Sequence, residues 1–403
     1  MSAFIRIAGA VCLPAVLLYV PAATRAEPTV RLSDGALVLR PSVLLNYDAA
    51  TTFAHSRAGG PGAATHPRRA RLGVEAEVFR DVEAALSWEF GGVPGSPSRL
   101  YEASLAYKGF GPVRLTGGLF KQQFSLERVQ SAADTLFLER AAVVNVASDL
   151  AAGISRAGVE VRAGGERWLV SAALTGGTTG PDPDSDQRGA VARVAGLPVR
   201  SGGFDLHLGV SGALSWKPPR ENGRRAASLS DGPELEVDRW SSPLGTGNIP
   251  ARRARTGGVE AGLGWGRLWA QGEAYVIQVD RAGSRGGTLG FSGWYAQAAY
   301  TVLGKPRSWK SSSAVWGAPE PAEGGFNPAQ GQWGAVEVGA RVSELDLSDK
   351  DVRGGQQRVW TAGVGWWPVT PVRVILQYQH VTIRGTDENR RFQAVALRGQ
   401  LAF

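Results

Sequence analysis

Sulfur and imidazole are scarce in this chain of 403 residues, which has one cysteine, Cys12, and four histidines. Cys12 lies in the apolar N-terminal segment, so the rest of the chain cannot form a disulfide, a thiolate zinc site, an iron–sulfur cluster or a cysteine nucleophile. No Gly-x-Ser-x-Gly, phosphate-loop or dinucleotide motif stands in a strand-to-helix context. We therefore expect no catalytic residue, no metal and no cofactor.

Long hydrophobic runs are also missing, with one exception at the N-terminus. Arg6 precedes an apolar stretch from Ile7 to Val20, and small residues follow as far as Ala26. This order is typical of a secretory signal. The stretch is shorter than the ~20 residues that a spanning helix needs, which disfavours the alternative, an uncleaved membrane anchor. We predict a signal peptide at 1–26 and one mature barrel domain at 27–403.

Positive charge is in excess, with a formal net charge of +8. Such a balance suits nucleic acid, anionic lipid or anionic solutes. No recognition-helix, RNA-stacking or zinc-finger pattern is present, so we expect no nucleic-acid partner. Many arginines lie in or beside 217–256, where they would face lipopolysaccharide, attract anions to a pore mouth or simply be solvated: Arg220, Arg224, Arg225, Arg239, Arg252, Arg253 and Arg255.

Apolar and polar residues alternate with period two after the leader, as in strands with one apolar face. The runs Leu72–Val78 and Val82–Phe90 flank a tight turn at Arg80-Asp81, which predicts a hairpin. About sixteen runs of roughly ten residues follow this rule, and that length suits a tilted strand crossing hydrocarbon. The sequence therefore predicts an all-β fold, a transmembrane antiparallel β-barrel. Strands of the alternative, a soluble sandwich or solenoid, usually have about five or six residues.

The ends of the predicted strands support a membrane barrel. The connections alternate between short and long, and we expect the long ones, 217–256 and 304–330, on one rim. Phe403 ends the last alternating run and resembles the terminal aromatic by which outer-membrane barrels are recognised for assembly. Aromatic residues near strand ends suit an interfacial girdle: Trp88, Phe90, Trp216, Trp265, Trp366 and Trp367.

The polar residues of the alternating runs would line the lumen if the apolar ones face lipid. The expected wall is mixed in charge. Both a charged pore lining and cross-strand salt bridges that stiffen the barrel stay open as interpretations. The cations are Arg71, Arg114, Arg156, Arg162, Arg341, Arg373 and Arg398, and the anions are Glu75, Glu77, Glu83, Glu89, Glu160, Asp205, Glu260, Glu273 and Glu337.

Several distinctive runs recur through most of the mature chain: Arg68–Glu75, Gly109–Val113, Gly118–Glu127, Phe137–Ala141, Phe291–Tyr300, Gly363–Pro368 and Arg398–Phe403. Together they resemble the phosphate-selective porin O and P family. The resemblance implies a sixteen-stranded barrel, usually trimeric, with a long third external loop, here about Lys121–Ala151, folded into the lumen. Lys121 and Arg140 match motif positions where basic residues of the family help attract anions, and Arg128 is a nearby candidate.

The predicted third loop departs from the family where relatives often carry basic residues. Ala132–Asp134 and Ser148–Ala151 stand at those places. The loop is then slightly acidic in net charge, because Glu127, Asp134, Glu139 and Asp149 oppose Lys121, Arg128 and Arg140. We expect Arg114 and Arg156 to complete the cationic side of the constriction. The anion preference should be modest, and saturable phosphate binding weak or absent.

These patterns predict an outer-membrane porin through which small hydrophilic solutes diffuse passively, with a modest preference for anions such as phosphate or polyphosphate. The expected partners are two further copies in a homotrimer, outer-membrane lipid, lipopolysaccharide and small anionic solutes. One alternative is a barrel hydrolase, for which His207 near Ser211 is the nearest approach to a base beside a hydroxyl. The other is an occluded structural or adhesive barrel.

Overall fold

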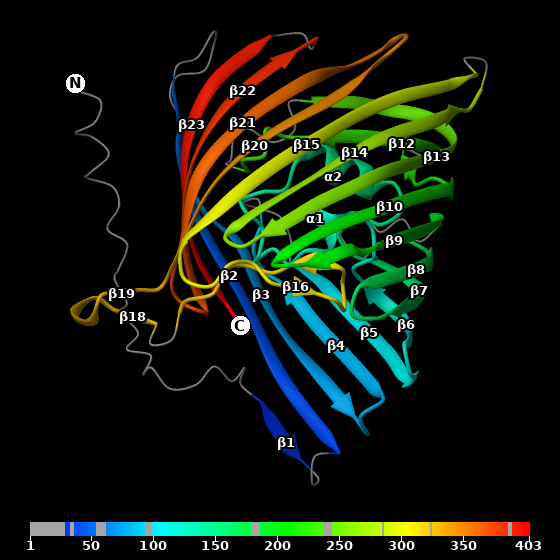
Figure 1. Ribbon diagram of the computed structural model, residues 1–403. Coiled ribbons are helices and arrows are strands. Elements are labelled where there is room, and N and C mark those ends of the chain that lie inside the picture. The colour runs from blue at the N-terminus through cyan, green and yellow to red at the C-terminus, as the bar shows by residue number, and fades with distance from the viewer. Residues whose placement is uncertain are drawn as a thin grey trace.

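The computed structural model describes residues 29–32, 36–53, 62–92, 98–178, 186–221, 223–236, 244–283, 286–322, 325–385 and 389–403. The predicted signal peptide, 1–26, lies outside the described residues and stays a prediction. Sixteen long strands form one closed antiparallel barrel (Figure 1). No helix in the described ranges has the length and apolar character needed to cross a membrane.

The barrel strands pair in chain order, and the last pairs with the first. Residues Leu44 and Ala402 are partners at this seam, where the Phe403 N–H also donates to the Val43 carbonyl at 3.1 Å. The strands are β2 (Leu37–Phe53), β3 (Ala63–Val78), β4 (Val82–Glu89), β5 (Arg99–Phe110), β6 (Val113–Phe120), β7 (Arg156–Gly164), β8 (Trp168–Thr175), β9 (Arg188–Ser201), β10 (Phe204–Lys217), β13 (Leu244–Trp265), β14 (Leu268–Arg281), β15 (Thr288–Leu303), β20 (Ala335–Asp349), β21 (Val352–Val369), β22 (Val372–Arg384) and β23 (Arg390–Ala402).

Short elements occupy the ends and connections. Two helices, α1 (Leu126–Val129) and α2 (Ala142–Asp149), follow β6. The others are β1 (Val30–Leu32), β11 (Arg220–Glu221), β12 (Arg224–Asp231), β16 (Trp309–Lys310), β17 (Val315–Trp316), β18 (Phe326–Asn327), the 3-10 helix η2 (Pro328–Gln330) and β19 (Gln332–Trp333).

The period-two alternation of apolar and polar residues in the sequence corresponds to side chains that point alternately outward and inward along each strand. On β15 the side chains of Trp294 and Tyr300 are exposed on the outer face, while Tyr295 and Gln297 between them are buried inside. The expected inward arginines and glutamates follow the same rule, and Arg341, Arg373, Arg398, Glu260, Glu273 and Glu337 are all buried in the interior. The prediction for Trp367 was wrong. Its neighbour Trp366 takes the outward position, so Trp367 faces the lumen beneath the Arg373 guanidinium.

The two predicted long loops lie on opposite rims, which corrects the expectation of one long-loop rim. Six short connections share one rim, the turn rim: 79–81, 111–112, 165–167, 202–203, 266–267 and 370–371. Because neighbouring strands are antiparallel, successive connections alternate between rims. The connection 304–334 therefore leaves the turn rim, whereas the one after β10 leaves the opposite, loop rim. The latter is also shorter than predicted, because β13 begins at Leu244.

The lumen is crossed by segments from both rims. Figure 1 shows α1 and α2 inside the barrel, with β16 below them. The residues of both helices are almost all buried. The largest buried apolar cluster joins α2 to the inner faces of β9, β10, β13, β14, β15, β20, β21 and β22. The interior is thus a packed core around the long connection between β6 and β7.

Candidate functional site

The connection 121–155, here called the lumen loop, is attached to the wall at several points. At its start, the Glu273 carboxylate on β14 accepts hydrogen bonds from the N–H groups of Leu126 (2.7 Å) and Glu127 (2.9 Å) and from the Ser125 hydroxyl (3.1 Å). The same hydroxyl accepts from the Arg128 N–H at 3.1 Å and so caps α1. The donors at the start of α1 are thereby satisfied by a fixed wall charge.

The middle of the lumen loop rests on two wall arginines. Arg373 on β22 donates to the carbonyls of Thr135 (2.6 Å) and Leu136 (2.8 Å). Arg398 on β23 donates to the Leu138 carbonyl and to the Glu139 carboxylate at 2.8 Å. Arg398 also pairs with the Asp48 carboxylate of β2 at 2.6 Å, and both arginines are almost fully buried, so they face the loop and the wall rather than solvent. The wall cations therefore position the loop backbone.

Arg341 on β20 is the central contact between the wall and two inserted segments. Its guanidinium donates to the carboxylates of Glu127 (3.3 Å) and Glu234 (2.6 Å) and to the Glu139 carbonyl (3.0 Å). Glu234 belongs to the connection after β12 and also accepts from the Ala142 N–H at 3.0 Å. All three charged side chains are inaccessible to solvent. One buried cation thus joins the lumen loop to a second loop from the same rim.

The acidic residues of the lumen loop are largely paired. Glu139 is within ion-pair distance of Arg68 (3.0 Å), Arg69 (2.8 Å) and Arg398 (2.8 Å). Burial alone would raise the pKa of Glu139, but these arginines hold it well below its usual range. Asp134 pairs with Lys310 at 2.7 Å. Their charges are therefore compensated by groups outside the loop.

Glu127, like Asp149, is a loop acid with the opposite pKa shift. Burial raises the pKa of its carboxyl to about 7, and the Arg341 guanidinium opposes that rise only in part. The carboxylate also accepts from the Ala141 N–H at 2.9 Å, while Glu273 repels its negative charge. A carboxyl in this setting gains and loses its proton near neutral pH.

The basic residues of the lumen loop have no such partners. Lys121 donates to the carbonyls of Val129 (2.9 Å) and Gln130 (3.4 Å), and Arg140 donates to the carbonyls of Glu127 (2.9 Å) and Gln130 (2.7 Å). Arg128 donates to the Gly153 carbonyl and the Asn145 side chain. None of the three cations lies within 4.0 Å of a carboxylate oxygen in the described part of the chain.

These three cations, here called the cation cluster, act on one another electrostatically. Lys121 and Arg140 share the Gln130 carbonyl as an acceptor, which places their charged groups side by side. Partial burial lowers the pKa of Lys121 well below its usual range, and the charges of Arg140 and Arg128 lower it further. An uncompensated group of positive charges attracts anions.

The other two predicted site residues lie apart from the cation cluster. Arg114 is near the turn-rim end of β6 and pairs with Glu83. Since Lys121 follows the opposite end of that strand, seven residues along, the two are separated by most of the wall height. Arg156 begins β7, where it donates to the Asp149 carbonyl (2.7 Å) and to Gln187. It lies at the exit of the lumen loop.

A segment from the turn rim, 305–320, meets the lumen loop from the opposite side. Arg307 pairs with Glu337 at 2.7 Å, and both side chains are nearly inaccessible. Trp316 packs against His207 and Trp269 of the inner wall, and its carbonyl accepts from the Gln130 side chain of the lumen loop at 2.8 Å. The lumen is therefore narrowed from both ends.

Sequence reasoning missed several residues of this site. Glu234 and Arg307 lie in irregular connections, where no periodicity signals an inward position. Arg193 gave a usable signal, because it occupies the inward phase of β9 between outward-facing Ala192 and Val194. It binds Glu260 at 2.8 Å, and His207 also contacts that carboxylate at 3.0 Å. His207 is thus held in an ion-pair network, with Ser211 bonded elsewhere, to Tyr275.

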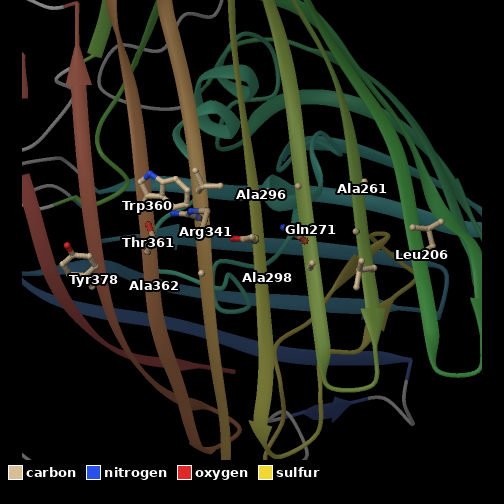
Figure 2. Close-up of a pocket in the computed structure, with 17 residues that line it drawn as sticks. Leu206, Ala261, Gln271, Ala296, Ala298, Arg341, Trp360, Thr361, Ala362 and Tyr378 are labelled. Atoms are coloured by element: carbon tan, nitrogen blue, oxygen red, sulfur yellow. The ribbon is translucent and has the colours of Figure 1, made fainter. Parts of the chain in front are cut away.

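A hollow on the outer face of the wall is separate from the lumen. Figure 2 shows Ala296 and Ala298 on β15, with Leu206 toward one edge and Trp360 and Tyr378 toward the other. Trp360 and Tyr378 are exposed in the outward phase of their strands. The hollow results from small side chains on the lipid-facing surface and takes no part in the pore.

Comparisons with known proteins agree with this architecture. A family model described as phosphate-selective porin O and P matches residues 45–403. The chain is 24% identical over 351 residues to Porin O of Pseudomonas aeruginosa, covering 80% of this chain and 78% of that one. It is similar in fold to an anion-selective porin from Comamonas acidovorans (TM-score 0.55, 12% identity, 91% and 100% coverage). It also resembles the trimer form of OmpT of Vibrio cholerae (TM-score 0.54, 11% identity, 91% and 100% coverage).

Proposed function

The chain belongs to the phosphate-selective porin O and P family, whose members are passive diffusion channels of the outer membrane, and on this premise we propose that its pore prefers anions. The observation that carries the proposal is the pairing pattern of the lumen loop. Glu127, Asp134 and Glu139 have cationic partners outside the loop, whereas Lys121, Arg128 and Arg140 have no carboxylate within 4.0 Å among the described residues.

This pattern changes the significance of the loop's formal charge. The loop is slightly acidic by count, but a carboxylate in contact with a guanidinium forms a nearly neutral pair. The electric field of such a pair is weak at the position of a passing solute. Asp149 is the one loop acid without a cation within 4.0 Å among the described residues, so the three members of the cation cluster outnumber the uncompensated acids of the loop. In a narrow, partly desolvated pore such charges act more strongly than in bulk water.

We propose small inorganic anions, including phosphate and polyphosphate, as the favoured solutes. Lys121 and Arg140 already use donors on backbone carbonyls, so they attract an anion mainly through charge and offer few free donors for a fixed geometry. Recognition of this kind gives modest selectivity with short residence. Arg156 at the loop exit would extend the cationic path, while Arg114, paired with Glu83, would contribute to the wall below it.

Reversal potentials of the full protein in planar bilayers test this assignment. Lys121→Glu should move the reversal potential toward the cation-selective side, and Lys121→Gln should move it by about half as much. Lys108→Gln is the matched control, because Lys108 already pairs with Glu83 at 2.9 Å. If the Lys108 and Lys121 variants shift the potential equally, the cation cluster does not set selectivity. Block of chloride current by phosphate should be weak in the wild type.

We also propose a homotrimeric assembly, contact with lipopolysaccharide and export with a cleaved leader. A homotrimer is supported by family membership and by the trimer form of OmpT. Lipopolysaccharide would meet the arginines near the loop rim, where Lys217, Arg220 and Arg225 surround one carboxylate, Asp186. We also propose that residues 1–26 are removed on export and that 27–403 form the mature domain. No enzymatic step is assigned to the barrel.

A barrel with an occluded lumen is the second candidate function, and two contacts favour it. The lumen loop and segment 305–320 touch through Gln130 and Trp316 and through Asp134 and Lys310. If these contacts seal the lumen, the protein would serve as a structural or adhesive element. Conductance steps that scale with salt concentration would reject this candidate, and their absence from a folded protein would favour it.

A further inference from the structure

The connection 304–334 sends a second arm to the outside of the barrel. Residues Phe326–Trp333 form a small hairpin, here called the rim hairpin, from β18, η2 and β19. It packs on Trp366, an outward-facing residue of β21. The Trp366 indole N–H donates to the Trp333 carbonyl at 2.8 Å, and the rings of Phe326 and Trp366 are 5.6 Å apart. Figure 1 shows β18 and β19 projecting away from the barrel wall.

The rim hairpin combines exposed aromatic rings with uncharged polar groups. Phe326 is 40% exposed and Trp333 is 52% exposed, and the two rings pack edge to face. The segment FNPAQGQW contains no charged residue, and its polar side chains are the amides of Asn327, Gln330 and Gln332. Aromatic rings beside amides suit the boundary between hydrocarbon and lipid headgroups, where rings are enriched and full charges are not required.

The height of the rim hairpin on the barrel matches that boundary. Exposed aromatic side chains stand next to short connections at the same rim: Phe79, Phe110, Trp168 and Trp265. Such a ring of aromatics marks an interface between membrane and water in outer-membrane barrels. Trp366 belongs to this ring by position, so the hairpin that covers it extends the aromatic belt sideways.

We propose that the rim hairpin is a membrane anchor that lies in the headgroup region of the leaflet at the turn rim. The partner is phospholipid, because the hairpin is continuous with the lipid-facing surface. Val338 on β20 and Val364 on β21 are exposed on that surface just above it. The anchor would fix the outer end of a connection whose inner end, segment 305–320, lies in the lumen. Backbone bonds between Lys305 and Glu320 close the inner arm.

Depth-dependent quenching of a single label tests the anchor. Cys12 is the one cysteine of the chain, so a Cys12→Ser background allows single-site labelling of the otherwise full chain. Ala329→Cys places a fluorophore at the exposed tip of the rim hairpin. Asp81→Cys, in a short connection of the same rim, is the aqueous control, and Ala362→Cys, on the outer face of β21, is the hydrocarbon control.

The labelled proteins are inserted into phosphatidylethanolamine–phosphatidylglycerol vesicles that contain lipid with a nitroxide at the headgroup or deep in the acyl chain. The Ala329 label should be quenched several-fold more by the headgroup nitroxide than by the deep one. The Ala362 label should show the reverse order, and the Asp81 label should respond mainly to aqueous iodide. Equal iodide quenching at Ala329 and Asp81, with no preference for headgroup nitroxide, would overturn the proposal.

Two further measurements separate lipid from a protein partner and confirm the role of the rings. The double variant Phe326→Ala/Trp333→Ala should make the Ala329 label accessible to iodide, whereas Trp333→Phe should leave its depth unchanged. An unchanged depth in the double variant would refute the role of the rings. Efficient cross-linking between Ala329 labels of neighbouring copies would refute the lipid assignment in favour of a subunit contact. Heat-modifiable migration of each variant verifies that the barrel has folded.

Discussion

Replacing Arg341 with methionine removes the buried cation that joins the lumen loop, the Glu234 segment and the wall. The side-chain volume is nearly kept, but two fully buried carboxylates lose their partner, at 2.6 Å for Glu234 and 3.3 Å for Glu127. Removing one member of a buried ion pair costs ~3–5 kcal/mol, because the remaining charge stays desolvated. The strand ladders are untouched, so this cost should fall on the docking of the loop rather than on the barrel.

A docking cost of ~3 kcal/mol raises the undocked population roughly a hundredfold. Single-channel recording should then show frequent excursions to higher current, and limited proteolysis should cut the lumen loop of the variant. Both effects should weaken as the pH falls through about 7, because Glu127, which no longer has Arg341 to oppose the rise of its pKa, takes up a proton and one unpaired charge disappears. The control is Arg358→Met, which breaks a partly exposed pair with Glu344, worth ~0–1 kcal/mol. A folded Arg341 variant with wild-type current noise and protease resistance would refute this reasoning.

Three other changes test separate parts of the account. Lowering the pH through about 7 should increase the anion preference, because protonation of Glu127 removes a negative charge beside the cation cluster. Glu127→Gln should show the high anion preference at all pH values. A change of anion preference near pH 7 that persists in this variant would contradict the assignment. The double change Trp309→Ala/Trp316→Ala should enlarge the conductance by loosening segment 305–320, whereas Trp294→Ala on the outer face should not. Phe403→Ala should lower the yield of assembled barrel although the backbone bonds of Phe403 to Val43 need no side chain; normal yield would show that the terminal ring is not the assembly signal.

The wall could be predicted from the sequence because a strand has a fixed period. Glu273 was assigned to the lumen and Trp88 to the outer girdle, and the burial of the first and the exposure of the second agree. Trp366 and Trp367 show why residue type alone is not enough to assign a girdle. Adjacent residues on a strand point to opposite faces, so only Trp366 could join the outer girdle. The same parity, applied to whole strands, places the connection 304–334 on the turn rim.

The lumen contacts could not be predicted, because they join residues from irregular segments that are distant in the sequence. Glu127 and Arg341 are 214 residues apart, and Glu139 and Arg398 are 259 apart. The family resemblance indicated Lys121 and Arg140, but a count of loop charges suggested that acids would cancel them. A count does not show where the charges lie: Glu127 and Glu139 contact Arg341 and Arg68, which belong to the wall and not to the loop.

The ion selectivity of the purified wild-type protein in a planar bilayer tests the central claim most directly. Across a potassium chloride gradient, an open pore governed by the uncompensated cation cluster should give salt-dependent current steps and a reversal potential displaced toward that of chloride. A displacement toward the potassium potential, or a folded protein without current steps, would contradict the account.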